Sequence, residues 1–303
     1  MRFLDLLYGI AIGDAVGNPL EFMQTVTEED ARRSYNSGAL RISDDTQMTL
    51  FCAEALSEET IAEMVAPHLS RAYLRWLETQ SQITLGDGLS SFKSLHHAEA
   101  PGNTCISALT SIKSGKPVLN DSKGNGTVMR CAPVAFWGSH LNLPRSKILR
   151  VAELDAQLTH KHEYAAQCSV LLTEIYLNLI GGLNLRESVT AASQSLQSQG
   201  LLNEYVHSMV LGCLDASEFK RNKVLLGGWV AEEALALAIG AVINSGTYLD
   251  AIYSAVSIEG DSDTVGAIAG GLAVASGMPV PAEAKSRLNA QDAIEYMGNS
   301  VNW

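Results

Sequence analysis

Two short acidic motifs lie far apart in the amino-acid sequence, and each comes directly before an apolar segment. Residues 43–48 read SDDTQM, and residues 259–264 read EGDSDT. Ionised carboxylates are costly to bury unless a positive charge compensates them. Neither motif contains a lysine or an arginine. A divalent cation is therefore the simplest counter-charge, and we expect the two motifs to converge in one cleft.

The ligand types indicate which cation would suit these motifs. Carboxylate and hydroxyl oxygens are the donors that Mg²⁺, Mn²⁺ and Ca²⁺ prefer. The motifs contain no cysteine or histidine, which argues against zinc. Two ions could be held between four carboxylates, as in two-metal hydrolases, namely those of Asp44, Asp45, Asp261 and Asp263. The alternative is that these residues are ordinary N-caps and dipole partners of helices.

A glutamate at the end of a third motif could supply acid–base chemistry. Residues 13–21 read GDAVGNPLE, and the glycine and proline before the glutamate favour an irregular loop. A loop carboxylate such as that of Glu21 can act as a general acid or base. The alternative is that Glu21 is an exposed glutamate without a catalytic role.

Two glycine-containing segments and one histidine could bind a phosphate group. Residues 122–130 read SKGNGTVMR and residues 101–104 read PGNT, and each precedes a predicted helix. Glycines let a ligand approach the backbone, and free amides at a helix start can hold a phosphate. His160, in the sequence LTHKH, could donate a hydrogen bond to such a group. The alternatives are ordinary turns and a structural histidine near a helix end.

The elements that must position these residues are helices. Apolar residues recur at spacings of three and four, and no alternating run of β-branched residues predicts a strand. Residues 266–275 are rich in glycine and alanine, which predicts a central, buried helix. Residues 80–101 and 114–126 are predicted to be irregular. Helix starts are predicted at Asn103, Pro144 and Asn184. Together these features predict one all-α domain of about ten helices over residues 1–303.

Composition excludes several classes of protein. The 303 residues include 33 acidic and 21 basic ones, and the net charge of −12 argues against binding to a nucleic-acid backbone. Hydrophobic residues make up 47% of the chain, but no apolar run is long enough to cross a bilayer. Five cysteines without a CxxC pair predict buried free thiols in a reducing compartment. We therefore expect a cytoplasmic protein that binds neither nucleic acid nor membrane.

The motifs, in their order and spacing, resemble the ADP-ribosylglycohydrolase family, which includes the ADP-ribosylhydrolases and the dinitrogenase-reductase-activating glycohydrolases. The likeness runs from Gly9 to about Gly277. The patterns GDAxGxPxE, [ST]DDTxM, SxGNGxxMR, LTH and GDxDTxGAIAG are matched by residues 13–21, 43–48, 122–130, 158–160 and 260–270. The second and the last of these patterns are the most specific.

The resemblance implies an all-α fold, two bound Mg²⁺ or Mn²⁺ ions and a role for each motif. Glu21 matches the position of a catalytic glutamate on a mobile loop. The metal-ligand positions match Ser43, Asp44, Asp45, Asp261, Asp263 and Thr264. The ADP-ribose cleft is expected to be lined by Gly102, Asn103, Thr104, Ser122, Gly124, Asn125, Gly126, Met129 and His160.

The expected reaction is metal-dependent hydrolysis of the glycosidic bond between ADP-ribose and an acceptor, with arginine favoured over serine and O-acetyl-ADP-ribose. One departure concerns the adenine. Some relatives place aromatic rings just before the GNG sequence, whereas residues 117–123 here contain none. Two alternatives therefore stay open, namely a non-catalytic relative that binds ADP-ribose or serves a structural role, and a dinuclear-metal hydrolase of another small nucleotide-like substrate.

Overall fold

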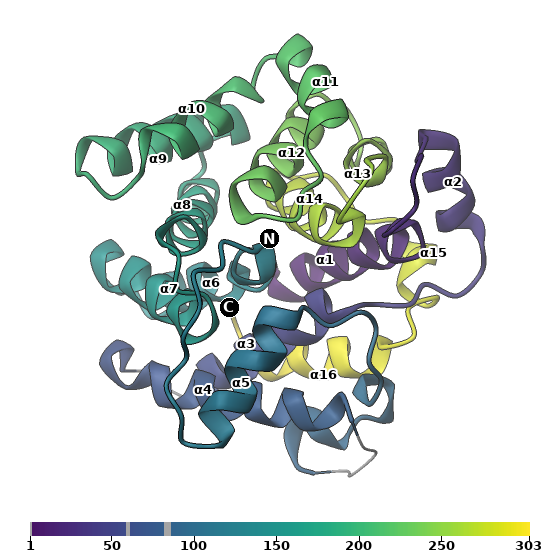
Figure 1. Cartoon of the computed structure of the whole chain (residues 1–303). Helices are drawn as coiled ribbons and strands as arrows, with labels where there is room; N and C mark the ends of the chain where they lie inside the picture. The colour runs from purple at the N-terminus through teal and green to yellow at the C-terminus, as the bar shows by residue number, and fades with distance from the viewer. Residues whose placement is uncertain (1, 59–60, 82–85) are drawn as a thin grey trace.

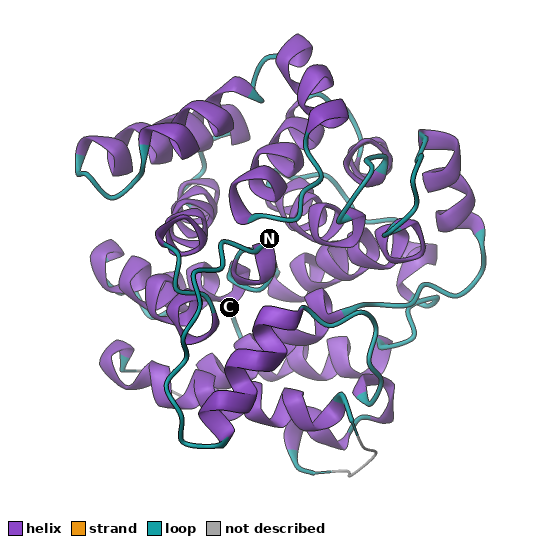
Figure 2. Ribbon diagram, in the orientation of Figure 1, coloured by secondary structure: helices purple, strands orange, loops and turns teal. Residues whose placement is uncertain are grey.

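Helices form almost all of the regular structure of this protein. The computed structural model describes residues 2–58, 61–81 and 86–303, and these contain sixteen α-helices and no β-sheet (Figures 1 and 2). The helices are α1 (Phe3–Gly17), α2 (Glu28–Asn36), α3 (Asp44–Ser57), α4 (Val65–Thr79), α5 (Asn103–Lys113), α6 (Ala132–His140), α7 (Arg145–Thr159), α8 (Glu163–Ile180), α9 (Leu185–Ser198), α10 (Glu204–Gly212), α11 (Ala216–Leu225), α12 (Ala231–Ile243), α13 (Tyr248–Val256), α14 (Ser262–Ala275), α15 (Ala282–Lys285) and α16 (Gln291–Ser300). The predicted all-α class is confirmed.

The predicted number of helices was too low. Several helices, such as α2, α6 and α10, have only nine residues each. Such a helix completes about two and a half turns, which is too few for a clear periodic signal in the sequence. Two predicted starts are close to the observed ones, because Pro144 precedes α7 and Asn184 is the N-cap of α9. The third predicted start, Asn103, is the first residue of α5, with Gly102 as the N-cap.

Two helices from opposite ends of the chain pack against each other at the centre of the molecule. Helices α1 and α14 lie side by side there (Figure 1). Their contact is lined by glycines, because a Cβ on Gly13 would lie 2.0 Å from the backbone oxygen of Gly266. In the same way, a Cβ on Gly270 would lie 2.1 Å from the oxygen of Gly9. The prediction of a buried, small-residue helix is confirmed, and its small residues allow this close approach.

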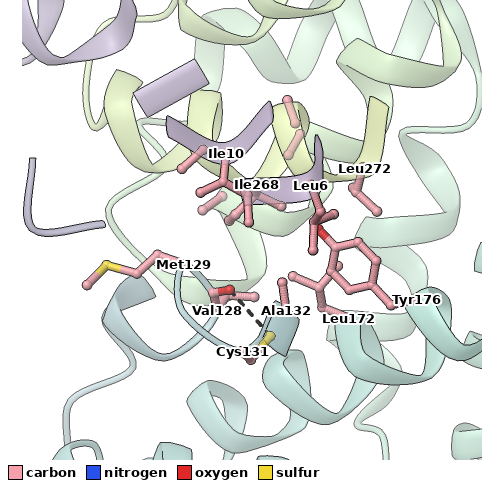
Figure 3. Close-up of a cluster of buried hydrophobic side chains, with 14 of the residues drawn as sticks. Leu6, Ile10, Val128, Met129, Cys131, Ala132, Leu172, Tyr176, Ile268 and Leu272 are labelled. Carbon is pink, nitrogen blue, oxygen red and sulfur yellow. Dashed lines mark hydrogen bonds between the residues drawn. The ribbon is translucent and has the colours of Figure 1, made fainter. Parts of the chain in front are cut away.

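A hydrophobic cluster joins this central helix pair to residues 122–130, which are called the glycine-containing segment from here on. Figure 3 shows side chains of α1, α8 and α14 around residues 128–132. The labelled members of the cluster are Leu6, Ile10, Val128, Met129, Cys131, Ala132, Leu172, Tyr176, Ile268 and Leu272. The Cys131 thiol donates a hydrogen bond to the backbone oxygen of Val128, with a sulfur–oxygen distance of 3.4 Å. The cluster therefore packs residues 128–132 against α14, the helix that carries the second acidic motif.

Three further predictions concern the cysteines, membrane-spanning segments and the irregular stretches. All five cysteines are buried, which agrees with the sequence. Within the described ranges, no helix combines the length and the apolarity needed to cross a membrane. Part of the predicted irregular stretch, residues 82–85, lies outside the described residues.

Candidate active site

The first acidic motif is held by a carboxylate from α1. Asp14 is fully buried, and its carboxylate accepts hydrogen bonds from the backbone N–H of Ser43, at 2.9 and 3.0 Å, and of Thr46, at 3.1 Å. It also accepts one from the Thr46 hydroxyl. Burial raises the pKa of Asp14 to about 6, although these hydrogen bonds oppose the shift. Asp14 therefore orients the first turn of α3, which carries Asp44 and Asp45.

The second acidic motif is held by two loops. Gly260 has a φ of 154°, and a Cβ there would lie 2.0 Å from the backbone oxygen of Gly227, so a side chain cannot be accommodated. The backbone N–H of Asp261 donates to that same oxygen at 2.8 Å. Asp261 is the N-cap of α14, and its carboxylate accepts a hydrogen bond from the Asn125 side-chain amide at 2.8 Å. The carboxylates at the start of α14 are thus fixed against the glycine-containing segment.

Both acidic motifs open into one cavity of about 260 Å³. All of the predicted site residues line it except Ser43 and Ser122. The lining residues are Glu21, Phe22, Asp44, Asp45, Ala100, Pro101, Gly102, Asn103, Thr104, Cys105, Gly124, Asn125, Gly126, Met129, His160, Trp229, Asp261, Asp263 and Thr264. The structure therefore brings together residues from six predicted sequence segments that are spread over most of the chain.

Ser43 and Ser122 are not among the lining residues, but each contacts residues that are. Ser43 is fully buried and is the N-cap of α3, and its hydroxyl lies 3.2 Å from a carboxylate oxygen of Asp45. The Ser122 hydroxyl lies 3.0 Å from the Thr104 hydroxyl and accepts a hydrogen bond from the Gly124 N–H at 3.2 Å. Short hydroxyl side chains readily form such local bonds to the backbone.

The acidic end of the cavity concentrates negative charge. Glu21, Asp261 and Asp263 each offer a carboxylate oxygen, and these atoms all lie within 4.8 Å of one another. Burial, and then repulsion from Asp261 and Asp44, raise the pKa of Glu21 to about 8. Burial raises the pKa of Asp44 to about 8 as well. One carboxylate oxygen of Asp45 is buried and has no hydrogen-bond partner among the described residues.

These observations indicate a site for cations. No lysine or arginine is found among the described residues that line the cavity. A carboxylate oxygen that is buried without a partner is costly, and a group of carboxylates within a few ångströms repels itself. Every donor at this end is an oxygen, which suits a hard divalent cation. The acidic motifs thus fit a metal site, and they also act as the helix caps that the sequence left as an alternative.

The other end of the cavity is neutral. Gly124 and Gly126 face the ring of His160, since a Cβ on Gly124 would lie 3.2 Å from its Nε2 atom. A Cβ on Gly126 would lie 2.9 Å from the Cys105 sulfur, so both glycines pack closely against neighbouring side chains. Burial and the nearby charge of Arg130 lower the pKa of His160 to about 3. His160 is therefore a neutral imidazole at physiological pH.

Two aromatic residues at the cavity were missed in the sequence. Phe22 and Trp229 are exposed and stacked, with ring centroids 5.5 Å apart and an interplanar angle of 28°. Phe22 directly follows Glu21 and has a φ of 65°, a conformation that non-glycine residues rarely adopt. The resemblance predicts rings just before the GNG sequence, in residues 117–123, whereas these two rings lie elsewhere in the chain. The signals available were an aromatic residue next to Glu21 and a tryptophan after two glycines.

A solved structure with a similar fold supports this architecture. It is described as an ADP-ribosylglycohydrolase-related protein complex. The superposition has a TM-score of 0.66 and covers 99% of this chain and 97% of that one, at 21% sequence identity. At this identity the likeness concerns the fold.

Characterised relatives are similar over most of their length. The ADP-ribosylarginine hydrolase Tri1 of Pseudomonas putida (strain GB-1) is 28% identical over 290 residues, which cover 90% of this chain and 71% of the relative. The enzyme of the same name from Serratia proteamaculans (strain 568) is 27% identical, and the match covers 91% of this chain and 72% of the relative. The ADP-ribosyl-[dinitrogen reductase] glycohydrolase of Rhodospirillum rubrum is 24% identical over 91% of this chain and 85% of its own length.

The family assignment rests on almost the entire sequence. The family model described as ADP-ribosylglycohydrolase matches residues 1–301. The matched residues include both acidic motifs, the glycine-containing segment and the loop that carries Glu21. The chain therefore belongs to the ADP-ribosylglycohydrolase family and is an enzyme that hydrolyses glycosyl bonds.

Proposed function

We propose that this protein releases ADP-ribose from modified arginine side chains of proteins by metal-dependent hydrolysis. The observation that carries the proposal is the meeting of Glu21 with both acidic motifs in one cavity. Arginine is favoured as the acceptor because two similar proteins are named ADP-ribosylarginine hydrolases. A protein substrate is favoured by the relative named for ADP-ribosylated dinitrogen reductase.

The acidic end is the part of the cavity that would hold the metal. The unpartnered oxygen of Asp45 and the absence of basic lining residues in the described chain support this assignment. Two Mg²⁺ or Mn²⁺ ions would be held by Asp44, Asp45, Asp261, Asp263 and Thr264, with the Ser43 hydroxyl beside Asp45 as a further donor. When bound, such ions supply positive charge that polarises ribose hydroxyls and the attacking water.

Glu21 is the residue that we assign to proton transfer. It is half-buried and reaches the cavity from the loop after α1, within 4.8 Å of ligand atoms of Asp261 and Asp263. The bond between the anomeric carbon and the guanidino nitrogen breaks through an oxocarbenium-like state. A water oxygen adds to that carbon. The proton released by the water passes through the Glu21 carboxylate to the departing nitrogen.

The rest of the cavity would bind the two parts of the substrate. The loops that carry Gly102, Gly124 and Gly126 let a ligand approach the backbone closely, and the neutral ring of His160 offers a hydrogen-bonding group for ADP-ribose. The exposed ring pair of Phe22 and Trp229 lies on the side of Glu21 and offers an aromatic face to the guanidino group of the acceptor. A guanidinium group stacks favourably on aromatic rings.

The proposal is tested by measuring ADP-ribose released from a protein that carries ADP-ribose on arginine. The assay is run with Mn²⁺ or Mg²⁺, with a chelator, and with a parallel substrate modified on serine. We expect release from the arginine-linked protein that requires the cation. Binding of free ADP-ribose without any release from either substrate would support the non-catalytic alternative. Neither binding nor release would favour a different nucleotide-like substrate.

A further inference from the structure

A buried ion pair lies behind the neutral end of the cavity, and the proposed reaction does not use it. Arg130 and Asp155 are both fully buried, and the Arg130 Nε donates to a carboxylate oxygen of Asp155 at 3.1 Å. The Tyr73 hydroxyl donates to the other carboxylate oxygen at 2.6 Å. Neither Arg130 nor Asp155 lines the cavity. This pair belongs to the sequence motifs of the site, since Arg130 ends the glycine-containing segment.

A threonine connects the ion pair to the cavity. Thr159 is fully buried, and its hydroxyl oxygen accepts a hydrogen bond from Nη2 of Arg130 at 3.0 Å. The same oxygen lies 2.9 Å from Nδ1 of His160. Among the described residues these are the only two hydrogen-bond partners of the Thr159 hydroxyl. The chain of contacts thus runs from Asp155 through Arg130 and Thr159 to the ring of His160.

The direction of each hydrogen bond in this chain is fixed by chemistry. A guanidinium group can only donate, so the Thr159 oxygen must accept from Arg130. The hydroxyl hydrogen then has one acceptor within reach, which is an unprotonated Nδ1 of His160. A hydrogen on Nδ1 would instead leave the buried hydroxyl hydrogen without an acceptor, which is unfavourable. A neutral imidazole with a bare Nδ1 carries its hydrogen on Nε2.

We propose that Arg130 and Thr159 are positioning residues that fix His160 as the Nε2–H tautomer, so that it donates a neutral hydrogen bond into the cavity. The Nε2 atom points to the glycine-containing segment, because it lies 3.2 Å from the place of a Cβ on Gly124. The group that accepts this bond would be an oxygen or nitrogen acceptor of ADP-ribose, and that part of the inference rests on the proposed function. The low pKa of His160 agrees with a neutral ring.

The tautomer is tested directly by nitrogen NMR of the full-length protein labelled with ¹⁵N-histidine. His160 is assigned from the signals that disappear in His160→Gln. We expect a protonated Nε2 and an unprotonated Nδ1. A protonated Nδ1, or a ring protonated on both nitrogens near neutral pH, would overturn the proposal. This measurement needs no substrate, so it stands apart from any failure of the proposed function.

A matched set of threonine variants tests the role of the hydroxyl. Thr159→Val keeps the shape but removes the hydroxyl, whereas Thr159→Ser keeps the hydroxyl. We expect Thr159→Val to lose the fixed tautomer and to bind ADP-ribose roughly three- to tenfold more weakly, as expected for one hydrogen bond. Its KM should rise more than its kcat falls. Thr159→Ser should restore both the tautomer and the affinity.

The control for a general loss of stability is Thr79→Val. Thr79 is also a buried threonine, and its hydroxyl donates to the backbone oxygen of Trp76 at 2.7 Å, but it does not line the cavity. We expect this variant to keep both the His160 tautomer and the affinity for ADP-ribose. An unchanged tautomer in Thr159→Val, or an equal loss of affinity in Thr79→Val, would contradict the assignment.

Discussion

The two ends of the cavity differ in how their buried charges are compensated. At the neutral end, the positive charge of Arg130 is matched inside the protein by Asp155, and His160 is uncharged. At the acidic end, burial and then repulsion from neighbouring carboxylates raise the pKa of Glu21, and no basic side chain is found among the described residues that line the cavity. The charge at the neutral end is therefore balanced within the protein, whereas no basic side chain among the described lining residues balances the carboxylates at the acidic end, which supports the proposed cation site.

The largest effect on turnover is expected from a substitution of Glu21. It distinguishes proton transfer from cation binding, which are both assigned to the acidic end. Glu21→Gln keeps the shape of the side chain but removes the acid–base group. General acid–base groups contribute roughly 10²–10⁴ in rate, and we expect a loss of turnover of that order. Stabilisation by Mn²⁺ and affinity for ADP-ribose should persist. Turnover within a few-fold of the wild type would show that another group carries the proton.

The same substitution at the two ends should change stability in different ways. Asp155→Asn leaves the buried charge of Arg130 uncompensated, and breaking such a pair costs about 3–5 kcal/mol. Asp263→Asn removes one of several buried carboxylates that repel each other, since burial and then neighbouring acids raise the pKa of Asp263. We therefore expect Asp263→Asn to leave the chelated protein as stable as the wild type or more stable.

The comparison is made by denaturant unfolding in the presence of a chelator. Both aspartates are almost fully buried, so the two variants are matched in burial and in chemistry. Asp263→Asn should also lose turnover and stabilisation by Mn²⁺. An equal loss of stability in the two variants would contradict the distinction between the two ends.

The two ends should also respond to pH in opposite directions. For Asp44 and Glu21, the folded pKa of about 8 lies above the unfolded values near 4, so the folded state binds protons more tightly. Their contribution to stability is present at low pH and is lost as the pH rises from about 4 through 8. A bound cation should remove this loss, because it stabilises the ionised carboxylates.

At the neutral end the sign is reversed. The folded pKa of His160, about 3, lies below its unfolded value near 6.5, so the unfolded state takes up the proton first. Stability from His160 is present above pH 6.5 and is lost as the pH falls toward 3. Thermal unfolding of His160→Gln and the wild type across this range, in chelator, measures the effect. A variant that loses stability on acidification as steeply as the wild type would contradict this sign.

The smallest effect is expected at the aromatic pair. A cation–π contact is worth about 0.5–2 kcal/mol, so Trp229→Leu should lower kcat/KM for the arginine-linked substrate roughly 2- to 30-fold. Tyr296→Leu is the control, because Tyr296 is also an exposed ring beside a phenylalanine but does not line the cavity. Affinity for free ADP-ribose should change less in Trp229→Leu. A larger loss of affinity for ADP-ribose than of kcat/KM would show that the ring pair contacts ADP-ribose and not the acceptor.

The sequence was sufficient to predict the features that are local in the chain. The helical class, the glycine-rich buried helix and the acidic motifs each follow from residue types within a short segment. The role of Asp14 could not be predicted in this way, because it binds the start of a helix that comes later in the chain. The ring pair was missed for the same reason, since Phe22 and Trp229 meet only after folding.

The two serines show a different limit. The expected roles of Ser43 at the metal and of Ser122 in the ADP-ribose cleft stay predictions, and neither residue is among those that line the cavity. A hydroxyl beside backbone N–H groups can cap a helix or a turn as well as bind a ligand, and the motif alone does not distinguish these uses. In the structure the Ser43 hydroxyl lies beside Asp45 and the Ser122 hydroxyl beside Thr104, so each makes a local contact of this kind.

The most direct test of the acidic end is the effect of a divalent cation on stability. Wild-type protein is first stripped with a chelator, and its unfolding free energy is then measured as Mn²⁺ or Mg²⁺ is added. A cation that binds only the folded state should stabilise the protein by about 2.7 kcal/mol at a concentration near 100 times its Kd. The gain should be absent in Asp263→Asn and retained in Glu21→Gln. No gain in the wild type with either cation would contradict the account.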